Sequence, residues 1–299
     1  MATEEKFCDD DFADMPKLLS EVVEHIKARM KNPNGLTGIS TGFEDLDRFT
    51  FGMQRGNLIV VAGRPSMGES ILTLNIAEHV ALIDRLPVAI FDMDRGMMNP
   101  TMLLLASYAK INYHDLRHGE IDNEQSERLS HAADVLKDAP IHISTNAAVS
   151  VQEVGERLRK LNKSTDGLGL VIVDCLPELK LTGEMADKKS AHEIAMISRH
   201  LKTLAKELDV PIVVLSPINR DLEERINKSP RLVDLPYGGA IASAADLVVF
   251  VYRDSVYDCE SADQGMAEII VAKNTNGSVG SFLLKYNEKY PRFEEFRPD

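Results

Sequence analysis

The sequence predicts an α/β fold in which a mostly parallel β-sheet carries helices on both faces. Two observations indicate this class: short, almost continuously apolar segments alternate with helical stretches, and a glycine-rich turn follows the first apolar segment. Strands that are apolar along their whole length are typical of parallel sheets covered on both faces. A chain of 299 residues with 44% hydrophobic and 27% charged residues can bury such a core.

The chain begins with an acidic stretch, residues 1–15, that carries no periodic apolar pattern and is expected to form a loose tail. A helix is predicted from Pro16 to about Met30, because proline suits the first helical turn and apolar residues follow at helical spacing. The helix and a linker occupy residues 16–35, and the linker contains Asn32-Pro33-Asn34-Gly35. The apolar stripe of this helix has two interpretations, a cap on the same domain or a contact with a neighbouring copy.

The sheet and its helices are expected from residue 58 onward. In order, the predicted elements are strand Leu58–Gly63, helix Glu69–Ile83, strand Val88–Phe91, two helices over about Asn99–Leu136, strand Ile141–Ile143, helix Val151–Leu161, strand Leu170–Val173, helix His192–Leu208, and strands Pro211–Leu215, Leu247–Tyr252 and Ala267–Ala272. Ligands of such sheets bind beyond the carboxyl ends of the strands, so functional residues are expected there.

Charge and cysteine content narrow the possible functions. The net charge of −13 is unfavourable for a protein whose affinity would depend on neutralising phosphates. The three cysteines are far apart and have no paired ligand spacing, so a metal site or a disulfide framework is not expected. The acidic N-terminus and the lack of a long apolar run predict a cytoplasmic protein without a secretory signal or membrane span.

Residues 63–70 form a phosphate-binding loop pattern in which the usual lysine is replaced by Glu69. A unit-charge pair about 4 Å apart is worth on the order of 4 kcal/mol at an effective dielectric of about 20, so the reversed charge opposes phosphate binding. One interpretation is a structural turn that binds nothing. In the other, Arg64, the loop amides and Ser70 hold a diphosphate weakly, and Glu69 is protonated or meets Mg²⁺. The nucleotide-binding candidates are Gly63, Arg64, Pro65, Ser66, Met67, Gly68, Glu69 and Ser70.

Five stretches in order give the chain a resemblance to a known family. They are Leu36-Thr-Gly-Ile-Ser-Thr-Gly-Phe-Glu-Asp-Leu-Asp47, Gly63-Arg-Pro-Ser-Met-Gly68, Val171-Ile-Val-Asp174, Ser198-Arg-His-Leu-Lys-Thr-Leu-Ala-Lys-Glu-Leu208 and Lys273-Asn-Thr-Asn-Gly277. Together they resemble the C-terminal motor domain of DnaB-type replicative DNA helicases of superfamily 4. The resemblance implies a RecA-like P-loop NTPase fold over residues 36–299, preceded by a linker helix, and a hexameric ring on single-stranded DNA with ATP sites shared between subunits. The family's separate N-terminal helical domain is expected to be absent, and the linker helix would then be the main remaining assembly element.

The resemblance assigns the family's reactive positions to residues of this sequence, and several of these residues differ from the family pattern. The catalytic glutamate position is Asp94, one methylene shorter, and a misplacement near 1 Å can cost about 100-fold in rate. The γ-phosphate-sensing glutamine position is Pro217, which has neither a side-chain amide nor a backbone donor. Lys273 is retained from a Lys-x-Arg pair that reaches the next subunit's nucleotide, but Thr275 replaces its arginine finger, a group worth about 10³ to 10⁵ in rate elsewhere.

Two features are retained at the expected metal position. Asp174 keeps the Walker B carboxylate at a strand end, and Ser70 keeps the hydroxyl that would contact Mg²⁺ if a nucleotide binds. ATP and Mg²⁺ are therefore expected as weak ligands.

The DNA-facing loop has also changed. The family's Arg-Glu-Ser-Gly turn is Pro236-Tyr-Gly-Gly here, which leaves the backbone amides of Gly238 and Gly239 as DNA contacts. Lys188, Lys189 and Arg220 are further weak DNA-binding candidates, and a solvated basic loop is the equally acceptable alternative.

Three hypotheses follow. The first is a degenerate helicase motor that assembles as a poorly hydrolysing ring subunit or regulates a replicative helicase or another replisome protein. The second is an active ATP-dependent 5′–3′ helicase in which Arg64, Lys273 or a relocated basic residue replaces the missing groups. The third is a non-catalytic ring that binds single-stranded DNA, against which the net charge argues.

Overall fold

The computed structural model describes residues 14–30, 35–93, 100–144, 150–181 and 190–297. The chain divides into two compact units, residues 1–37 and 38–299. The first unit contains helix α1 (Met15–Met30), which matches the helix predicted from Pro16. Its apolar side chains Leu18, Leu19, Val22, Val23 and Ile26 are exposed. Within the described residues, no helix combines the length and apolar character that a bilayer crossing requires.

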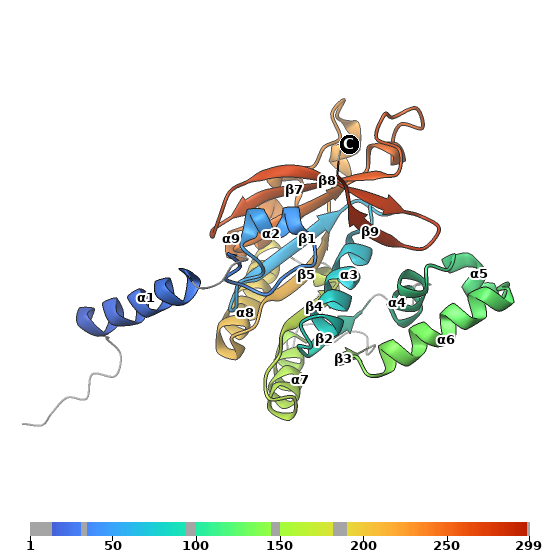
Figure 1. The fold of residues 1–299 in the computed structure, drawn as a ribbon. Helices are drawn as coiled ribbons and strands as arrows, with labels where there is room; N and C mark the ends of the chain where they lie inside the picture. Colours follow the sequence, from blue (N-terminus) through green and yellow to red (C-terminus); the bar gives the residue numbers. More distant parts are fainter. Residues whose placement is uncertain (1–13, 31–34, 94–99, 145–149, 182–189, 298–299) are drawn as a thin grey trace, which may run out of the picture. The chain divides into compact units, whose positions relative to one another are not determined.

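The second unit is built on one mixed sheet, and its described residues form nine strands in the order β3-β2-β4-β5-β1-β6-β7-β8-β9 (Figure 1). The strands from β3 to β6 pair in parallel, and β7 to β9 continue the sheet in antiparallel fashion. The strands are β1 (Leu58–Gly63), β2 (Val88–Asp92), β3 (Ile141–Ser144), β4 (Leu170–Asp174), β5 (Ile212–Pro217), β6 (Leu247–Tyr252), β7 (Met266–Asn274), β8 (Gly280–Asn287) and β9 (Arg292–Glu295). The predicted mostly parallel sheet is confirmed.

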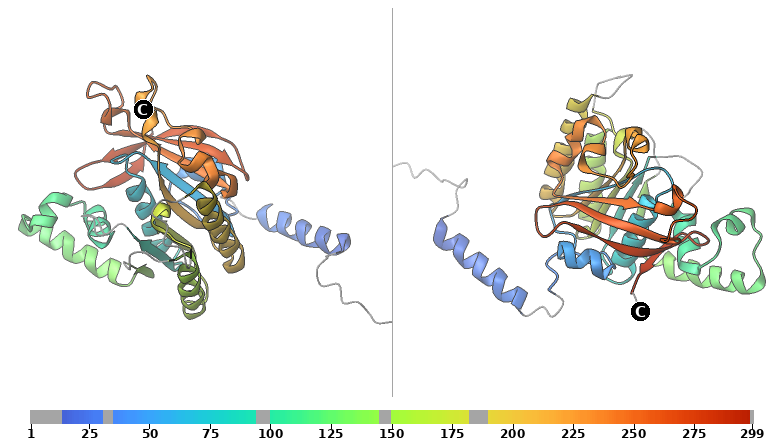
Figure 2. Two further views of the ribbon diagram at one scale, coloured as in Figure 1. Left: turned by 180° about the vertical axis from the view of Figure 1, so that it is seen from behind. Right: turned by 90° about the horizontal axis from the view of Figure 1, so that it is seen from above.

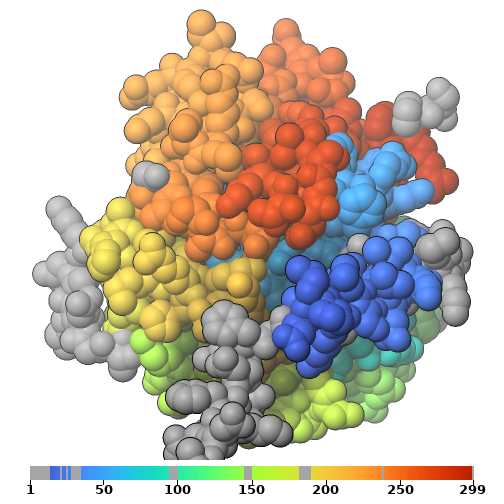
Figure 3. Space-filling model, turned by 90° about the vertical axis from the view of Figure 1, so that its left-hand side faces the viewer, coloured from blue at the N-terminus to red at the C-terminus, as the bar shows by residue number. Residues whose placement is uncertain are grey.

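Helices cover both faces of the sheet, and alternate residues of β1 divide the core between them (Figures 1 and 2). Ile59 and Val61 belong to the cluster that includes α3 (Glu69–Leu82), whereas Leu58 and Val60 belong to the cluster with α7 (Val151–Ser164) and α8 (Ala191–Leu208). Figure 3 shows α8 in yellow beside the orange segment that holds α9 (Ala240–Ala244), with which it makes contacts. Strand β1, which leads into the glycine-rich loop, is therefore packed against helices on both faces of the sheet.

The region expected to contain two helices contains three among its described residues: α4 (Pro100–Ala109), α5 (Tyr113–His118) and α6 (Asn123–Lys137). The prediction missed two caps. The side chain of Asn112 accepts hydrogen bonds from the amides of His114 and Asp115, and Gly119 in the left-handed conformation ends α5. Asp122 and Gln125 then form a capping box that starts α6.

The prediction also missed short elements outside the parallel sheet. Strands β8 and β9 are half-exposed, so they lack the continuous apolar character by which the inner strands were recognised. Helix α2 (Glu44–Thr50) is only seven residues long, and its Asp47 accepts hydrogen bonds from Ser40 and Thr41 in the segment before the helix. The hairpin of β8 and β9 matters for the site because its side chains contact the glycine-rich loop.

Candidate nucleotide-binding site

The loop that follows β1 lies at the carboxyl end of the sheet, as expected from the strand order. Its backbone turns sharply because Ser66 and Gly68 have positive φ angles of 73° and 102°. Gly68 is the N-cap of α3, and a Cβ there would lie 2.9 Å from Cζ of Phe293 on β9. This close approach, together with the backbone angle, requires glycine at position 68.

Ser70 and Asp174, the two expected metal ligands, lie together. The hydroxyl of Ser70 donates to Oδ2 of Asp174 at 2.9 Å, although 104 residues separate them along the chain. Asp174 ends β4 and is the register partner of Asp92 on β2. An oxygen pair at this position is the kind of donor set that Mg²⁺ takes alongside nucleotide phosphates. The donor chemistry therefore fits a magnesium ion, and the geometry brings both residues to the loop.

Glu69 begins α3, and its carboxylate folds back over the loop. A Cβ at Gly63 would lie 2.9 Å from Oε2 of Glu69. Burial raises the pKa of Glu69 from 4.5 to about 7, and the nearby charge of Asp174 also raises it. Hydrogen bonds from the backbone at Glu69 and Gly68, and the charge of Arg64, act in the opposite direction. The acid that replaces the lysine is thus located within the loop rather than in solvent.

The basic residues invoked as substitutes for that lysine are engaged elsewhere. Arg64 donates through Nε and Nη2 to Glu223 at 2.9 and 2.5 Å, and through Nη1 to the carbonyl of Ile218 at 3.1 Å. Lys273 donates to the carbonyls of Ala242 and Ala245 at 2.8 and 2.6 Å. Arg64 thus pairs with a carboxylate and a carbonyl, Lys273 binds two backbone carbonyls, and neither side chain takes the place of the missing lysine.

Pro217 lies at the edge of the loop. It ends β5 and pairs in register with Gly63, so the position carried over as a phosphate sensor is next to the phosphate loop. Thr275 lies at the other end of the sheet, because its amide donates to the carbonyl of Asp246 and the amide of Asp246 donates to Leu58, the first residue of β1. Within one chain the structure does not bring Lys273 and Thr275 to the loop.

The remaining expected residues give a mixed outcome. Asp94, Lys188 and Lys189 lie outside the described residues. Arg220 is exposed at the start of a 3₁₀ turn, and Gly238 and Gly239 belong to a second 3₁₀ turn (Tyr237–Gly239). Pro65 and Ser66 are exposed, whereas Met67 is buried and its sulfur accepts a hydrogen bond from the amide of Arg253.

Sequence reasoning missed Arg253 and Tyr286, which lie against the loop. Arg253 is buried, donates to the carbonyl of Ser66 at 3.0 Å, pairs with Glu288, and lies over the ring of Tyr286. A Cβ at Gly68 would lie 3.3 Å from Cε2 of Tyr286. Because Arg253 directly follows apolar strand β6, its position at a carboxyl end could have identified it.

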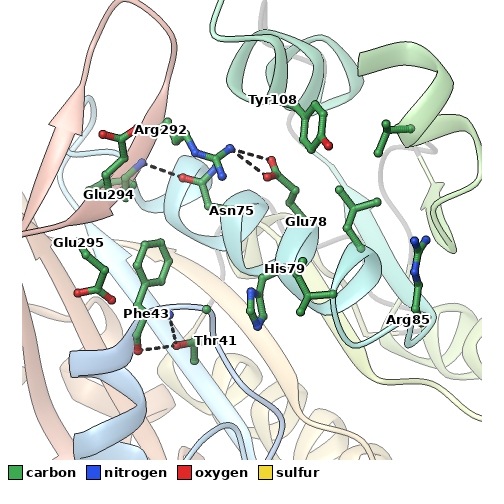
Figure 4. A pocket seen from close by; sticks show the side chains of 15 residues that line it. Thr41, Phe43, Asn75, Glu78, His79, Arg85, Tyr108, Arg292, Glu294 and Glu295 are labelled. Atoms are coloured by element: carbon green, nitrogen blue, oxygen red, sulfur yellow. Dashed lines mark hydrogen bonds and ion pairs between the residues drawn. The ribbon is translucent and has the colours of Figure 1, made fainter. Parts of the chain in front are cut away.

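A separate hollow of about 570 Å³ lies beside the C-terminal half of α3 (Figure 4). Nη1 of Arg292 donates to both carboxylate oxygens of Glu78 at 3.0 and 3.2 Å, and Asn75 accepts from the amide of Phe293 at 2.9 Å. Asn75 is six residues beyond Glu69, about 9 Å along a helix, so this hollow is distinct from the phosphate loop. The ion pair between Arg292 and Glu78 in this hollow links β9 to α3.

A parallel α/β sheet with a glycine-rich loop after its first strand, and a serine and an aspartate beneath that loop, defines the class of P-loop nucleotide-binding folds. The family model described as DnaB-like helicase C terminal domain matches residues 38–295. The chain belongs to the DnaB-like helicase C-terminal domain family.

Individual relatives agree with this assignment. "Replicative DNA helicase DnaB" of Buchnera aphidicola subsp. Acyrthosiphon pisum (strain APS) is 38% identical over 282 residues, covering 94% of this chain and 61% of the relative. "Replicative DNA helicase DnaC" of Bacillus subtilis (strain 168) is 36% identical over 282 residues, covering 94% and 62%. The chain therefore spans about three fifths of the length of these curated relatives.

Two solved structures share the fold. One, an isolated ATPase domain, superposes with a TM-score of 0.89 at 30% identity, covering 96% of this chain and 100% of that one. The helicase in "The Structure Of A DnaB-Like Replicative Helicase And Its Interactions With Primase" gives a TM-score of 0.86 at 30% identity, covering 96% and 68%. The expected RecA-like ATPase fold and family resemblance are confirmed.

Proposed function

We propose that the chain is a DnaB-family motor domain that functions in DNA replication but hydrolyses ATP poorly. In this proposal it assembles as a ring subunit, with its own copies or with a replicative helicase, and modulates that helicase. Family membership supports the replication role. The altered residues at the reactive positions support the loss of turnover.

The observation that carries the proposal is the arrangement of charge around the phosphate loop. Glu69 lies over Gly63, while Arg64 is paired with Glu223 and Lys273 donates to backbone carbonyls. A lysine at position 69 would stabilise the negative charge of the phosphates, whereas a carboxylate opposes it. Pro217 beside the loop removes a further donor.

Weak binding of ATP with Mg²⁺ remains part of the proposal. Ser70 and Asp174 would hold the ion, and the ion would neutralise phosphate charge when a nucleotide is bound. The loop backbone would hold the phosphates. The separation of Lys273 and Thr275 from the loop of the same chain is what an ATP site shared between neighbouring subunits requires.

Assembly would depend on α1, whose exposed apolar residues form a stripe suited to a neighbouring subunit. We extend the proposal to weak contact with single-stranded DNA through Arg220 and the amides of Gly238 and Gly239. Two neighbouring cations are already engaged: Arg225 pairs with Asp234, and Lys228 donates to the carbonyls of Glu223 and Arg225.

Two measurements test the proposal. ATP hydrolysis by the purified protein is expected to be slow and to respond little to single-stranded DNA. Mass photometry of the protein alone and mixed with a replicative helicase is expected to detect self-assembly or mixed assembly. Hydrolysis that single-stranded DNA stimulates and Asp174→Ala abolishes would contradict the proposal.

The retained Ser70–Asp174 contact favours one alternative, an active ATP-dependent 5′–3′ helicase. Unwinding of a forked DNA substrate, lost on Asp174→Ala, would establish that function. A matched Asp84→Ala variant, at a position after α3 and away from the loop, would have to retain the activity.

A further inference from the structure

The phosphate loop contains an anion that belongs to the protein itself. In loops of this kind, backbone N–H groups turn inward and bind the phosphate oxygens of a nucleotide. Here the carboxylate of Glu69 lies beside Gly63, the first glycine of the loop: a Cβ at Gly63 would be 2.9 Å from its Oε2. Gly68 and Glu69 stand at the N-terminus of α3, the end of the loop where phosphate oxygens would bind.

Among the described residues, no cation pairs with this carboxylate at salt-bridge distance. Arg64 directs its guanidinium to Glu223 and Ile218, and Arg253 directs its own to Glu288 and the carbonyl of Ser66. Asp174 adds a second negative charge nearby. The carboxylate therefore stands at the phosphate loop as an anion attached to the first residue of α3 by its own side chain.

We propose that the carboxylate of Glu69 occupies the phosphate cradle as an internal competitor, so that a diphosphate or triphosphate must displace it in order to bind. This inference rests on the proposed function and deepens it. The missing lysine weakens the attraction for phosphate, and the glutamate in addition fills the position that phosphate would take. In this proposal the loop not only lacks the lysine but is also blocked by the side chain of Glu69.

The test separates occupation from simple repulsion by shortening the side chain while keeping its charge. Glu69→Asp retains the carboxylate but removes the methylene needed to reach over Gly63. Glu69→Ala removes both the charge and the occupant. Binding of inorganic pyrophosphate to each full-length protein is measured by isothermal titration calorimetry at one alkaline pH, where the carboxyl group is ionised, with a chelator present so that no metal ion bridges the carboxylates.

Occupation predicts that Glu69→Asp binds pyrophosphate more tightly than the wild type by at least about fivefold, and Glu69→Ala by at least about tenfold, because removing a unit charge is worth more than shifting it. The matched control Glu120→Ala removes one charge from an exposed position remote from the loop and should leave the affinity unchanged. If Glu69→Ala does not fold, Glu69→Asp still decides the question.

Two results would overturn the inference. Equal affinities of the wild type and Glu69→Asp, with tighter binding only in Glu69→Ala, would mean that charge alone opposes phosphate. No change in either variant would mean that Glu69 merely caps α3. The proposed function fails on a different measurement, DNA-stimulated ATP hydrolysis by the wild type, so the two failures are distinguishable.

Discussion

Replacing Glu69 with glutamine should change the dependence of stability on pH. The folded-state pKa of Glu69 is raised from 4.5 to about 7, chiefly by burial, so the folded protein binds this proton more tightly than the unfolded chain. Below the unfolded value both states are protonated and there is no penalty. As the pH rises through the interval between the two pKa values, the folded state loses stability, and above it the penalty is complete.

One pKa unit corresponds to about 1.36 kcal/mol, so the full penalty from this shift is about 3 kcal/mol. Glutamine has nearly the same shape and no charge. We therefore expect the free energy of unfolding of Glu69→Gln, relative to the wild type, to rise by about 2 to 3 kcal/mol between about pH 5 and pH 8. Urea denaturation at several pH values, with a chelator present, measures this difference.

Glu120→Gln is the matched control, since Glu120 is exposed in the segment between α5 and α6. Its stability relative to the wild type should stay within about 0.5 kcal/mol at every pH. A difference between Glu69→Gln and the wild type that does not vary with pH would refute the reasoning. It would mean that the carboxylate is solvated and does not lie over the loop.

Three further predictions concern other parts of the molecule. Arg292→Ala should lower the free energy of unfolding by about 3 kcal/mol, because it leaves the buried carboxylate of Glu78 unpaired; replacing both residues with apolar ones should cost less, and an equal cost would contradict this account. Leu19→Asp in α1 should reduce self-assembly in mass photometry without changing the melting temperature of the remainder, whereas unchanged assembly would remove α1 as the assembly element. Glu69→Lys should raise nucleotide affinity in fluorescence titrations far more than ATP turnover, because Thr275 still lacks a guanidinium; full recovery of turnover would show that another residue acts in its place.

The parallel half of the fold could be predicted because its signal is local and strong. Each inner strand, such as β1 or β4, is a short apolar run buried along its length, and periodic helices lie between the strands. The antiparallel hairpin of β8 and β9 lacks such a signal, because its residues are only half-buried. The break of the predicted helix pair into α4, α5 and α6 depended on the side-chain caps of Asn112 and Asp122, which a periodicity search does not detect.

The candidate site was only partly predictable. The meeting of Ser70 and Asp174 follows from the rule that parallel strands present their carboxyl ends at one edge. The pairing of Arg64 with Glu223 could not be anticipated, because Glu223 belongs to a 3₁₀ turn whose path depends on tertiary packing. The acid at position 69 is evident in the linear chain, but only the three-dimensional arrangement places its carboxylate over Gly63.

Under the proposed function, the positions of the altered residues predict that a single substitution does not restore ATP turnover. Glu69 and Pro217 flank the same loop at the carboxyl end of the sheet, whereas Thr275 lies at the amino end, where it could serve only the site of another subunit. A subunit altered at both ends would weaken its own site and the site of its neighbour. If this chain enters rings of an active relative, ATP turnover of the mixture should therefore fall more steeply than the fraction of active subunits, and Leu19→Asp should abolish that inhibition. A decline that follows simple dilution would mean that the two proteins do not share rings.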